Sequence, residues 1–362
     1  MSSTALIVGA SGVVGASAID SFLRRNWEVI AVSRRSPEVS SDRPFRHLPI
    51  DLFDARAAAE ALEPLQGITH VVFAALSEKP GLVEGWSDPA QMQVNLEMLR
   101  SVIQPLTARS RSLRHVSIMQ GTKAYGLHLH PMDIPARERS PRDPHPNFYW
   151  LQEDYLKEKA AANGFGYTIL RPQMVVGGAI GAAMNTAPVL GAYAAICREL
   201  GEPFGFPGGP SFVWEASDAR LVGDVLEWAA RSEQAHGETF NVTNGDVFEW
   251  RNLWPAIADA LGVEPAADRP MSLGAYLPAQ AGVWDAIVRK HGLRPVSLQT
   301  LLGESHHIAD FCFATGATQT PPPAFISGIK LRQAGFTDVI DTEDMYRYWL
   351  RNLIDRKLLP AR

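Results

Sequence analysis

Short apolar runs rich in β-branched residues alternate with segments of helical periodicity through the first half of the chain. Strands so apolar, separated by helices, are typical of a parallel sheet covered on both faces. Because right-handed crossovers wind such a chain outward from its first strand, the pattern predicts a doubly wound α/β fold. Strands are predicted at residues 5–8, 28–33, 46–51, 70–74, 114–118, 167–170 and 239–242, and helices at 13–25, 55–63, 92–107 and 154–163.

The alternation ends after about residue 176, where glycine, proline and aromatic residues become frequent. Pro207-Gly-Gly-Pro210 and Pro321-Pro-Pro323 are loop signals in this part of the chain. Carboxylates that cap helices indicate helix starts at Asp246 and Asp341. We expect a dinucleotide-binding domain at 1–175, a smaller and mostly helical substrate-binding lobe at 176–325 from which 216–246 returns to the first domain, and a C-terminal helical segment at 326–362.

A glycine-rich segment, Gly9-Ala-Ser-Gly12-Val-Val-Gly15, follows the first predicted strand and opens the first helix. Its first glycine permits a tight turn, the second lets backbone approach a pyrophosphate, and the third lets the helix pack close to the sheet. The helix N-terminus then offers unpaired N–H groups to the anion. The residues expected to hold the phosphates of a Rossmann-bound dinucleotide are Gly9, Ser11, Gly12, Val13, Val14 and Gly15.

The second predicted strand ends in Ser33-Arg34-Arg35, where a site selective for NAD would place an acidic residue against the ribose. Two guanidinium groups suit a 2′-phosphate instead, so the segment predicts NADPH (NADP+) as the cofactor. At the end of the third strand, Asp51 is suited either to accept from the adenine amino group or to cap the next helix. Further cofactor contacts are expected at Leu52, Ala74, Ala75, Leu76, Gln120, Pro172 and Val175.

Two tyrosines compete for the role of the catalytic tyrosine found in short-chain reductases. Tyr155 has Lys159 four residues on, the spacing that places an ammonium beside the phenol on a helix. Tyr149 has Glu153 at that position. The two tyrosines are six positions apart, roughly 240° around a helix, so they cannot share one site. Lys123, just past the strand at 114–118, lies where doubly wound sheets form their active cleft and is a second source of an ammonium.

These segments together resemble the progesterone 5β-reductase/iridoid synthase-like family of atypical extended short-chain reductases. The resemblance covers nearly the whole chain, and its most specific segments are Asn147-Phe-Tyr149 and Gly245-Asp-Val-Phe-x-Trp250. It also includes Gly9–Gly15, Ser33-Arg-Arg35, Thr69-His-Val-Val-Phe73, Gly121-Thr-Lys-Ala-Tyr125, Arg171-Pro172, Met184-Asn185 and Tyr193-Ala-Ala-Ile-Cys197.

The resemblance implies that Tyr149 is the catalytic tyrosine, that Lys123 is its partner and that Tyr155 has no catalytic role. It implies reduction of the activated C=C bond of an enone by 1,4-hydride addition, with Tyr149 and Lys123 stabilising the enolate oxygen. Three positions depart from the family pattern: Trp150 replaces a tyrosine, Ala124 a histidine and Ala182 a serine. The substrate is expected against Phe148, Met184, Asn185 and Trp214.

Two alternative functions stay open at this point. One is a carbonyl reductase or another extended short-chain enzyme, such as an epimerase or dehydratase, although Glu153 and the Arg34-Arg35 pair disfavour epimerases because these keep the Tyr-x-x-x-Lys pair and prefer NAD. The other is a non-catalytic NADPH-binding sensor. Retention of both Tyr149 and Lys123 disfavours that alternative.

Composition and charge indicate which partners and which location to expect. With 34 Lys+Arg against 39 Asp+Glu, the net charge of -5 disfavours nucleic-acid binding, which needs a dense basic face. Residues 172–197 lack charge, but their glycines, Asn185 and Pro188 disfavour a membrane span. Two cysteines, and a start without signal-peptide features, favour a reducing, cytoplasmic location. We expect no metal site, a small hydrophobic enone as substrate and a homodimer as the candidate oligomer.

Overall fold

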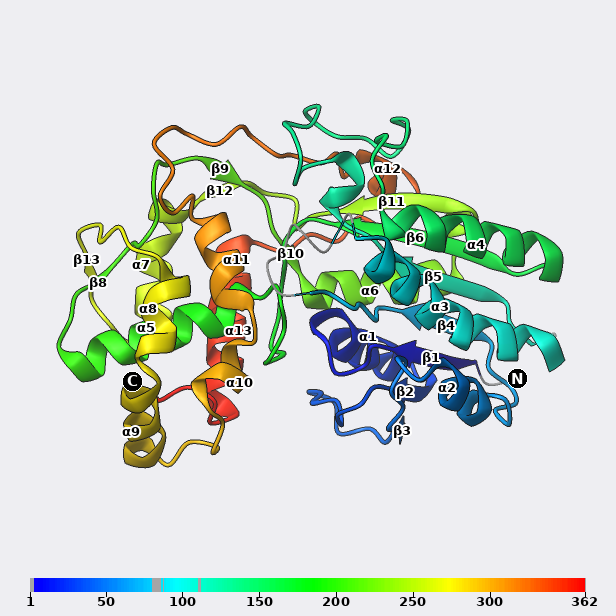
Figure 1. The fold of residues 1–362 in the computed structure, drawn as a ribbon, viewed down its shortest axis with the longest axis horizontal. Coiled ribbons are helices and arrows are strands. Elements are labelled where there is room, and N and C mark those ends of the chain that lie inside the picture. Colours follow the sequence, from blue (N-terminus) through cyan, green and yellow to red (C-terminus); the bar gives the residue numbers. More distant parts are fainter. Residues whose placement is uncertain (1–2, 80–85, 87, 110–111, 362) are drawn as a thin grey trace. The chain divides into compact units, whose positions relative to one another are not determined.

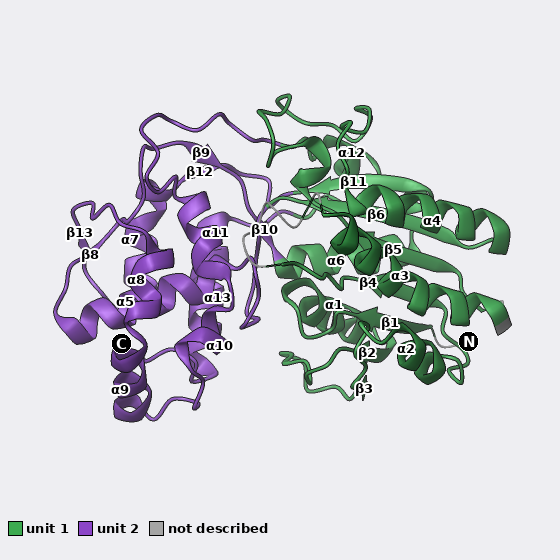
Figure 2. Ribbon diagram, viewed as in Figure 1, with its two compact units in different colours: residues 1–173, 219–242, 326–338 green, residues 174–218, 243–325, 339–362 purple. Residues whose placement is uncertain are grey.

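The computed structural model describes residues 3–79, 86, 88–109 and 112–361. Figure 1 shows their helices and strands, and Figure 2 shows that they form two compact units. The chain passes between these units more than once. Unit 1 contains residues 1–173, 219–242 and 326–338, and unit 2 contains residues 174–218, 243–325 and 339–362.

Unit 1 is built on a seven-stranded sheet in the order β11-β6-β5-β4-β1-β2-β3. Every neighbouring pair in it runs parallel, and the order turns outward on both sides of β1 and β4. This topology confirms the predicted doubly wound α/β fold. The strands are β1 (Thr4–Val8), β2 (Glu28–Val32), β3 (Arg46–Leu48), β4 (His70–Phe73), β5 (His115–Met119), β6 (Gly166–Pro172) and β11 (Glu238–Val242).

Helices cover both faces of this sheet. On one face α1 packs against α6, and the contact is close because Gly223 of α6 has no Cβ: one placed there would lie 2.7 Å from the Ser17 carbonyl oxygen. On the other face α3 lies between α2 and α4. The helices and turns of unit 1 are α1 (Val13–Arg24), α2 (Ala55–Leu62), α3 (Pro89–Arg109), η2 (Thr122–Tyr125), α4 (Phe148–Asn163), α6 (Ala219–Arg231), η3 (Glu233–Ala235) and α12 (Ile329–Gln333).

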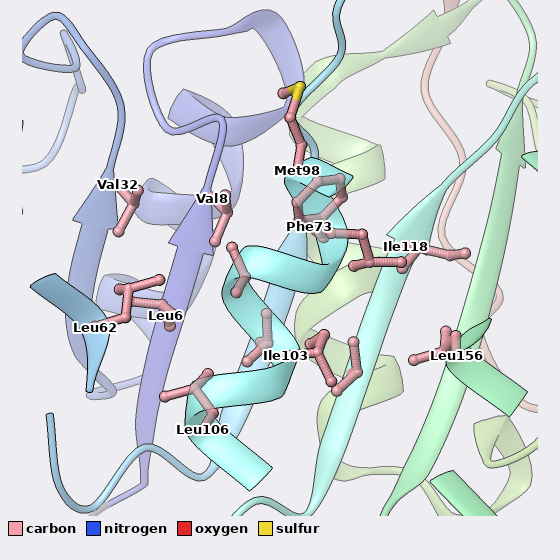
Figure 3. Packing of buried hydrophobic residues seen from close by; sticks show 14 of the residues in the cluster. Leu6, Val8, Val32, Leu62, Phe73, Met98, Ile103, Leu106, Ile118 and Leu156 are labelled. Atoms are coloured by element: carbon pink, nitrogen blue, oxygen red, sulfur yellow. The ribbon is translucent and has the colours of Figure 1, made fainter. Parts of the chain in front are cut away.

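The main apolar core of unit 1 lies between the sheet and α2, α3 and α4. Figure 3 shows side chains of β1, such as Leu6, together with Phe73 of β4 and Ile118 of β5, beside Ile103 and Leu106 of α3. All five are buried. Because central strands such as β1 and β4 are buried along their whole length, they pack against helices on either side, as the sequence pattern predicts.

Unit 2 is mainly helical, with three short two-stranded ladders, β10-β7, β12-β9 and β13-β8. Its longest buried helix, α5, begins after the glycine-rich stretch at 177–181. Among the described residues, no helix is both long and apolar enough to cross a bilayer. The elements are β7 (Val175–Val176), α5 (Thr186–Leu200), β8 (Phe204–Gly205), β9 (Val213–Trp214), β10 (Ser217–Asp218), β12 (Phe248–Glu249), α7 (Trp250–Leu261), β13 (Pro265–Ala266), α8 (Leu273–Ala279), α9 (Ala281–His291), α10 (Leu298–Leu302), α11 (Ser305–Cys312) and α13 (Thr342–Asp355).

The two predicted capping carboxylates of unit 2 have different outcomes. Asp341 caps α13 by accepting from the N–H groups of Glu343 and Asp344, as predicted. Asp246 does not cap α7, which begins four residues later at Trp250. Its carboxylate instead accepts from the backbone N–H (2.9 Å) and hydroxyl (2.6 Å) of Thr342. The prediction for Asp246 was wrong because its partner is distant in sequence.

Candidate active site

The glycine-rich loop after β1 has a backbone that only glycine fits. Gly9 has a φ of +81°, and a Cβ on it would lie 2.6 Å from the backbone of Ala74 and Ala75. A Cβ on Gly15 would lie 2.2 Å from the Gly9 carbonyl oxygen. The loop therefore presses directly against the end of β4 and against the first turn of α1. Any side chain at these two positions would force the backbone apart.

The N-terminus of α1 lies directly behind this loop. Its N-cap is Gly12, which has no side chain to accept from the first-turn N–H groups, and the first turn contains no acidic residue. The N–H groups of Val13, Val14 and Gly15 have no intrahelical acceptor in an α-helix. Donors and a positive helix end behind a glycine cradle fit the pyrophosphate of a dinucleotide.

The segment after β2 carries the two arginines expected at a 2′-phosphate. The Ser33 hydroxyl donates to the Arg35 carbonyl oxygen at 2.7 Å, which holds the turn in place. His47 of β3 reinforces it, with Nε2 at 2.9 Å from the Ser33 carbonyl oxygen. Both guanidinium-bearing residues are exposed, and Arg34 lies over the ring of Phe53, 5.6 Å from its centroid. Sequence reasoning missed His47 and Phe53, because neither belongs to a motif of fixed spacing.

Asp51, at the end of the third strand segment, does not cap α2. It accepts from the Phe53 N–H at 3.1 Å, in a turn that precedes the helix. The N-cap of α2 is Asp54, which accepts from the Ala57 N–H at 2.9 Å. The capping alternative for Asp51 was therefore wrong, since the helix begins one turn later. Leu52 beside it is buried.

Tyr149 lies in the first turn of α4, which begins at Phe148 rather than near residue 154. The start is set by Asn147, whose side-chain oxygen accepts from the Tyr149 N–H at 3.0 Å. The nitrogen of the same amide donates to the Lys123 carbonyl oxygen at 3.3 Å and approaches His145 Nε2 at 3.1 Å. One side chain thus ties the segment of Tyr149 to that of Lys123. The aromatic run at 148–150 hid the helix start from the periodicity.

The phenol of Tyr149 is buried beside the end of β5. Its hydroxyl oxygen lies 3.5 Å from where a Cβ on Gly121 would be. Burial raises the pKa of Tyr149 far above its usual 10.0, and the nearby Glu78 carboxylate raises it further, while Arg171 lowers it. The phenol is therefore neutral at physiological pH. It is available as a hydrogen-bond donor.

Lys123 is on η2, and its ammonium contacts Trp86, a member of the buried cluster that also contains Phe148 and Tyr149. Its Nζ is 3.3 Å from Glu78 Oε1 and 3.7 Å from the centroid of the Trp86 ring. The Trp86 ring also contacts those of Tyr149 and Phe148, at centroid distances of 5.1 and 4.8 Å. Burial lowers the pKa of Lys123 from 10.5 to about 8, although Glu78 raises it. Glu78 and Trp86 were not predicted, because nothing in the local sequence marks them.

Glu153 occupies the position four residues after Tyr149, where the Tyr-x-x-x-Lys pattern has lysine. Burial alone would raise its pKa, but hydrogen bonds from Lys157, Arg142 and Gln120 hold it below the usual range. Gln120 bridges this carboxylate, at 3.0 Å, to Nε of Arg171, at 2.8 Å. The side chain of this predicted cofactor-binding residue thus belongs to a buried charge network behind Tyr149.

Tyr155 lies on α4 in the main core, not at the site. Its ring is buried, and Arg100 lies over it at 5.4 Å from the centroid. Burial raises its pKa to about 12. Lys159 is 5.5 Å from the ring centroid and bonds to Glu158. The Tyr155–Lys159 pair therefore belongs to the packing between α4 and α3.

The remaining predicted residues divide between the two units, with Ala74 and Ala75 against the glycine loop. Ala74, Ala75 and Leu76 follow β4, and Pro172 ends β6. Met184, Asn185, Trp214 and Val175 lie in unit 2. Asn185 is buried before α5, and its amide donates to the carbonyl oxygens of Gly177 and Ala179, both at 2.8 Å. Trp214 is also buried, and among the described residues its indole N–H has no hydrogen-bond partner.

Comparison with known proteins shows the family to which the chain belongs. A model described as "PRISE-like Rossmann-fold domain" matches residues 56–302, more than half of the chain. The chain belongs to the PRISE-like Rossmann-fold family. This confirms the predicted family and, with it, an oxidoreductase of the extended short-chain dehydrogenase/reductase class.

Named relatives cover most of the chain. An (S)-8-oxocitronellyl enol synthase of Camptotheca acuminata is 30% identical, covering 99% of this chain and 94% of that protein. A 3-oxo-Delta(4,5)-steroid 5-beta-reductase of Arabidopsis thaliana is 32% identical over 82% of this chain and 80% of that protein. Among solved structures, a UDP-glucose 4-epimerase of Thermus thermophilus in complex with NAD has a TM-score of 0.65 at 18% identity, covering 96% of this chain and 98% of its own, which supports the fold.

Proposed function

We propose that this enzyme uses NADPH to reduce the activated C=C bond of an enone by 1,4-addition. The observation that carries the proposal is that the phenol of Tyr149 and the ammonium of Lys123 come from different segments of the chain. A buried, neutral phenol and an ammonium come from separate segments, α4 and η2, while Glu153 holds the position of the usual lysine. Such a pair suits a donor to an oxyanion better than it suits proton delivery to an alkoxide.

The residues of this chain act on the substrate's oxygen. When bound, NADPH supplies a hydride to the β-carbon of the enone. The negative charge moves to the carbonyl oxygen, where the Tyr149 hydroxyl donates a hydrogen bond and the Lys123 ammonium adds positive charge. Both groups are desolvated, so their effect on a developing oxyanion is larger than in water. A proton from water at the α-carbon then completes the saturated ketone.

The cofactor assignment is supported by the geometry around the end of β2. Arg34 and Arg35 are exposed there, Ser33 and His47 fix the turn, and no acidic residue occupies the position that would bind a ribose hydroxyl. Gly9, Gly12 and the first turn of α1 would hold the pyrophosphate. A guanidinium pair that faces a phosphate favours NADPH over NADH.

The substrate class is proposed from the apolar surroundings of Tyr149 and from the relatives. The named relatives act on a steroid enone in one case and form an oxocitronellyl enol in the other. Phe148 and Trp86 pack against the Tyr149 ring. Phe148, Met184, Asn185 and Trp214 stay our candidates for substrate contacts.

The test is NADPH oxidation against a panel of enones, enals and saturated ketones, with identification of the products. Saturated ketones from enones support the proposal. Allylic alcohols would reassign the enzyme to carbonyl reduction. Tight NADPH binding without oxidation by any member of the panel would favour a sensor.

A further inference from the structure

We propose that Glu78 is a positioning residue that keeps Lys123 charged and holds its ammonium against the Trp86 ring. The role in turnover rests on the proposed function, whereas control of the charge on Lys123 does not. Glu78 lies in the segment after β4 and is 45 positions from Lys123, so only the fold brings them together.

The contacts form a closed arrangement. Glu78 Oε1 accepts from the Trp86 indole N–H at 2.7 Å and lies 3.3 Å from Lys123 Nζ. The Trp86 ring is itself the surface on which Nζ rests, at 3.7 Å, and it contacts the ring of Tyr149. The carboxylate thus holds both the ammonium and the aromatic ring on which the ammonium rests.

Burial makes this carboxylate more than a surface partner. The side chains of Glu78 and Lys123 are 6% and 17% exposed, so neither charge is well solvated. A buried ammonium tends to lose its proton unless an anion lies close. The second oxygen, Oε2, is buried and has no hydrogen-bond partner among the described residues. The hydrogen bonds of the carboxylate with Trp86 and with Lys123 both use its other oxygen, Oε1.

His128 and Tyr149, two titratable groups near Lys123, are neutral between pH 6 and 9. Burial lowers the pKa of His128 to about 4, with His145 and Lys123 lowering it further, so His128 stays neutral. Tyr149 stays neutral because burial raises its pKa. The pKa of Lys123, about 8, lies within that interval. Burial lowers this pKa and the Glu78 carboxylate raises it.

The experiment is a direct titration of Lys123 by NMR in the full-length protein labelled with 13C-lysine, with the signal assigned by Lys123→Arg. In Glu78→Gln the amide oxygen still accepts from Trp86, but the negative charge is gone. The midpoint of the Lys123 titration is expected to fall by about 1 to 3 pH units. Glu97→Gln, which removes a carboxylate from the surface pair with Arg100, is the control and should leave the midpoint unchanged. An unchanged midpoint in Glu78→Gln would overturn the proposal.

Turnover provides the second measurement. In Glu78→Gln the alkaline decline of kcat should move to lower pH by the same interval, with activity recovering as the pH is lowered. In a Lys123→Arg background the substitution should not move the decline, since arginine stays charged. If Glu78→Gln does not fold, Glu78→Asp keeps the charge but retracts it, and a smaller downward shift is expected; an unshifted midpoint there also overturns the proposal. If the wild type reduces no enone, the proposed function fails while the titration still decides the role of Glu78.

Discussion

Replacing Tyr149 by phenylalanine separates the hydroxyl from everything else the residue does. The ring, buried against Trp86 and Phe148, is retained, and the backbone N–H still bonds to Asn147. What is lost is one donor to the enolate oxygen in a desolvated site, worth about 3 kcal/mol of transition-state stabilisation. At 1.36 kcal/mol per decade, the rate of hydride transfer should fall on the order of a hundredfold or more.

The assay is single-turnover oxidation of NADPH at saturating enone, followed by absorbance, with cofactor affinity measured separately. Affinity for NADPH should change little. Tyr155→Phe is the matched control, because this tyrosine is on the same helix, is also buried, and has a hydroxyl without a hydrogen-bond partner among the described residues. It should be nearly silent. A Tyr149→Phe enzyme with undiminished turnover would refute the role given to the phenol.

Three further outcomes are expected. Arg34→Ala should weaken NADPH binding by about 10- to 100-fold and leave NADH binding nearly unchanged, measured by fluorescence titration; equal losses for both cofactors would contradict the assignment of Arg34. Gly9→Ala should lower the free energy of unfolding by about 2 kcal/mol or more in urea, because its Cβ meets backbone at 2.6 Å, whereas Gly67→Ala, with φ +77° and open space around it, should cost only about 1–2 kcal/mol. Burial lowers the pKa of His70 to about 4 and of His115 to about 3, so the unfolded chain takes up protons first as the pH falls below 6.5. Each histidine should therefore cost about 2 kcal/mol of stability at pH 5 relative to pH 7, and a flat pH dependence of urea unfolding would show that they are not buried as neutral groups.

The parallel sheet was predictable because its strands carry their signal locally. Runs such as those that form β1 and β4 are apolar on both faces, and only a sheet covered on both sides buries them. The glycine loop was predictable for the same reason, since its conformation is written in consecutive residues. Helix α4 was placed too late, because a single cap at Asn147 starts it within an aromatic run.

The electrostatic half of the site was not predictable. Glu78 meets Lys123 across 45 positions, and Arg171 meets Gln120 across 51. No periodicity or motif specifies such pairs, since they depend on which strand ends lie side by side in the folded sheet. The formal Tyr155–Lys159 spacing was, conversely, a local signal without a site, because the side of α4 that carries it faces the core.

The Asn147 side chain donates a hydrogen bond to the Lys123 carbonyl oxygen and accepts one from the Tyr149 N–H, and this has a consequence for engineering. A loop near the site can be exchanged without loss of this link only if the carbonyl oxygen of residue 123 stays within hydrogen-bond distance of the Asn147 side chain. Libraries that randomise residues 121, 122, 124 and 125 while keeping Lys123 and Asn147 should yield more active clones than libraries that also vary Asn147.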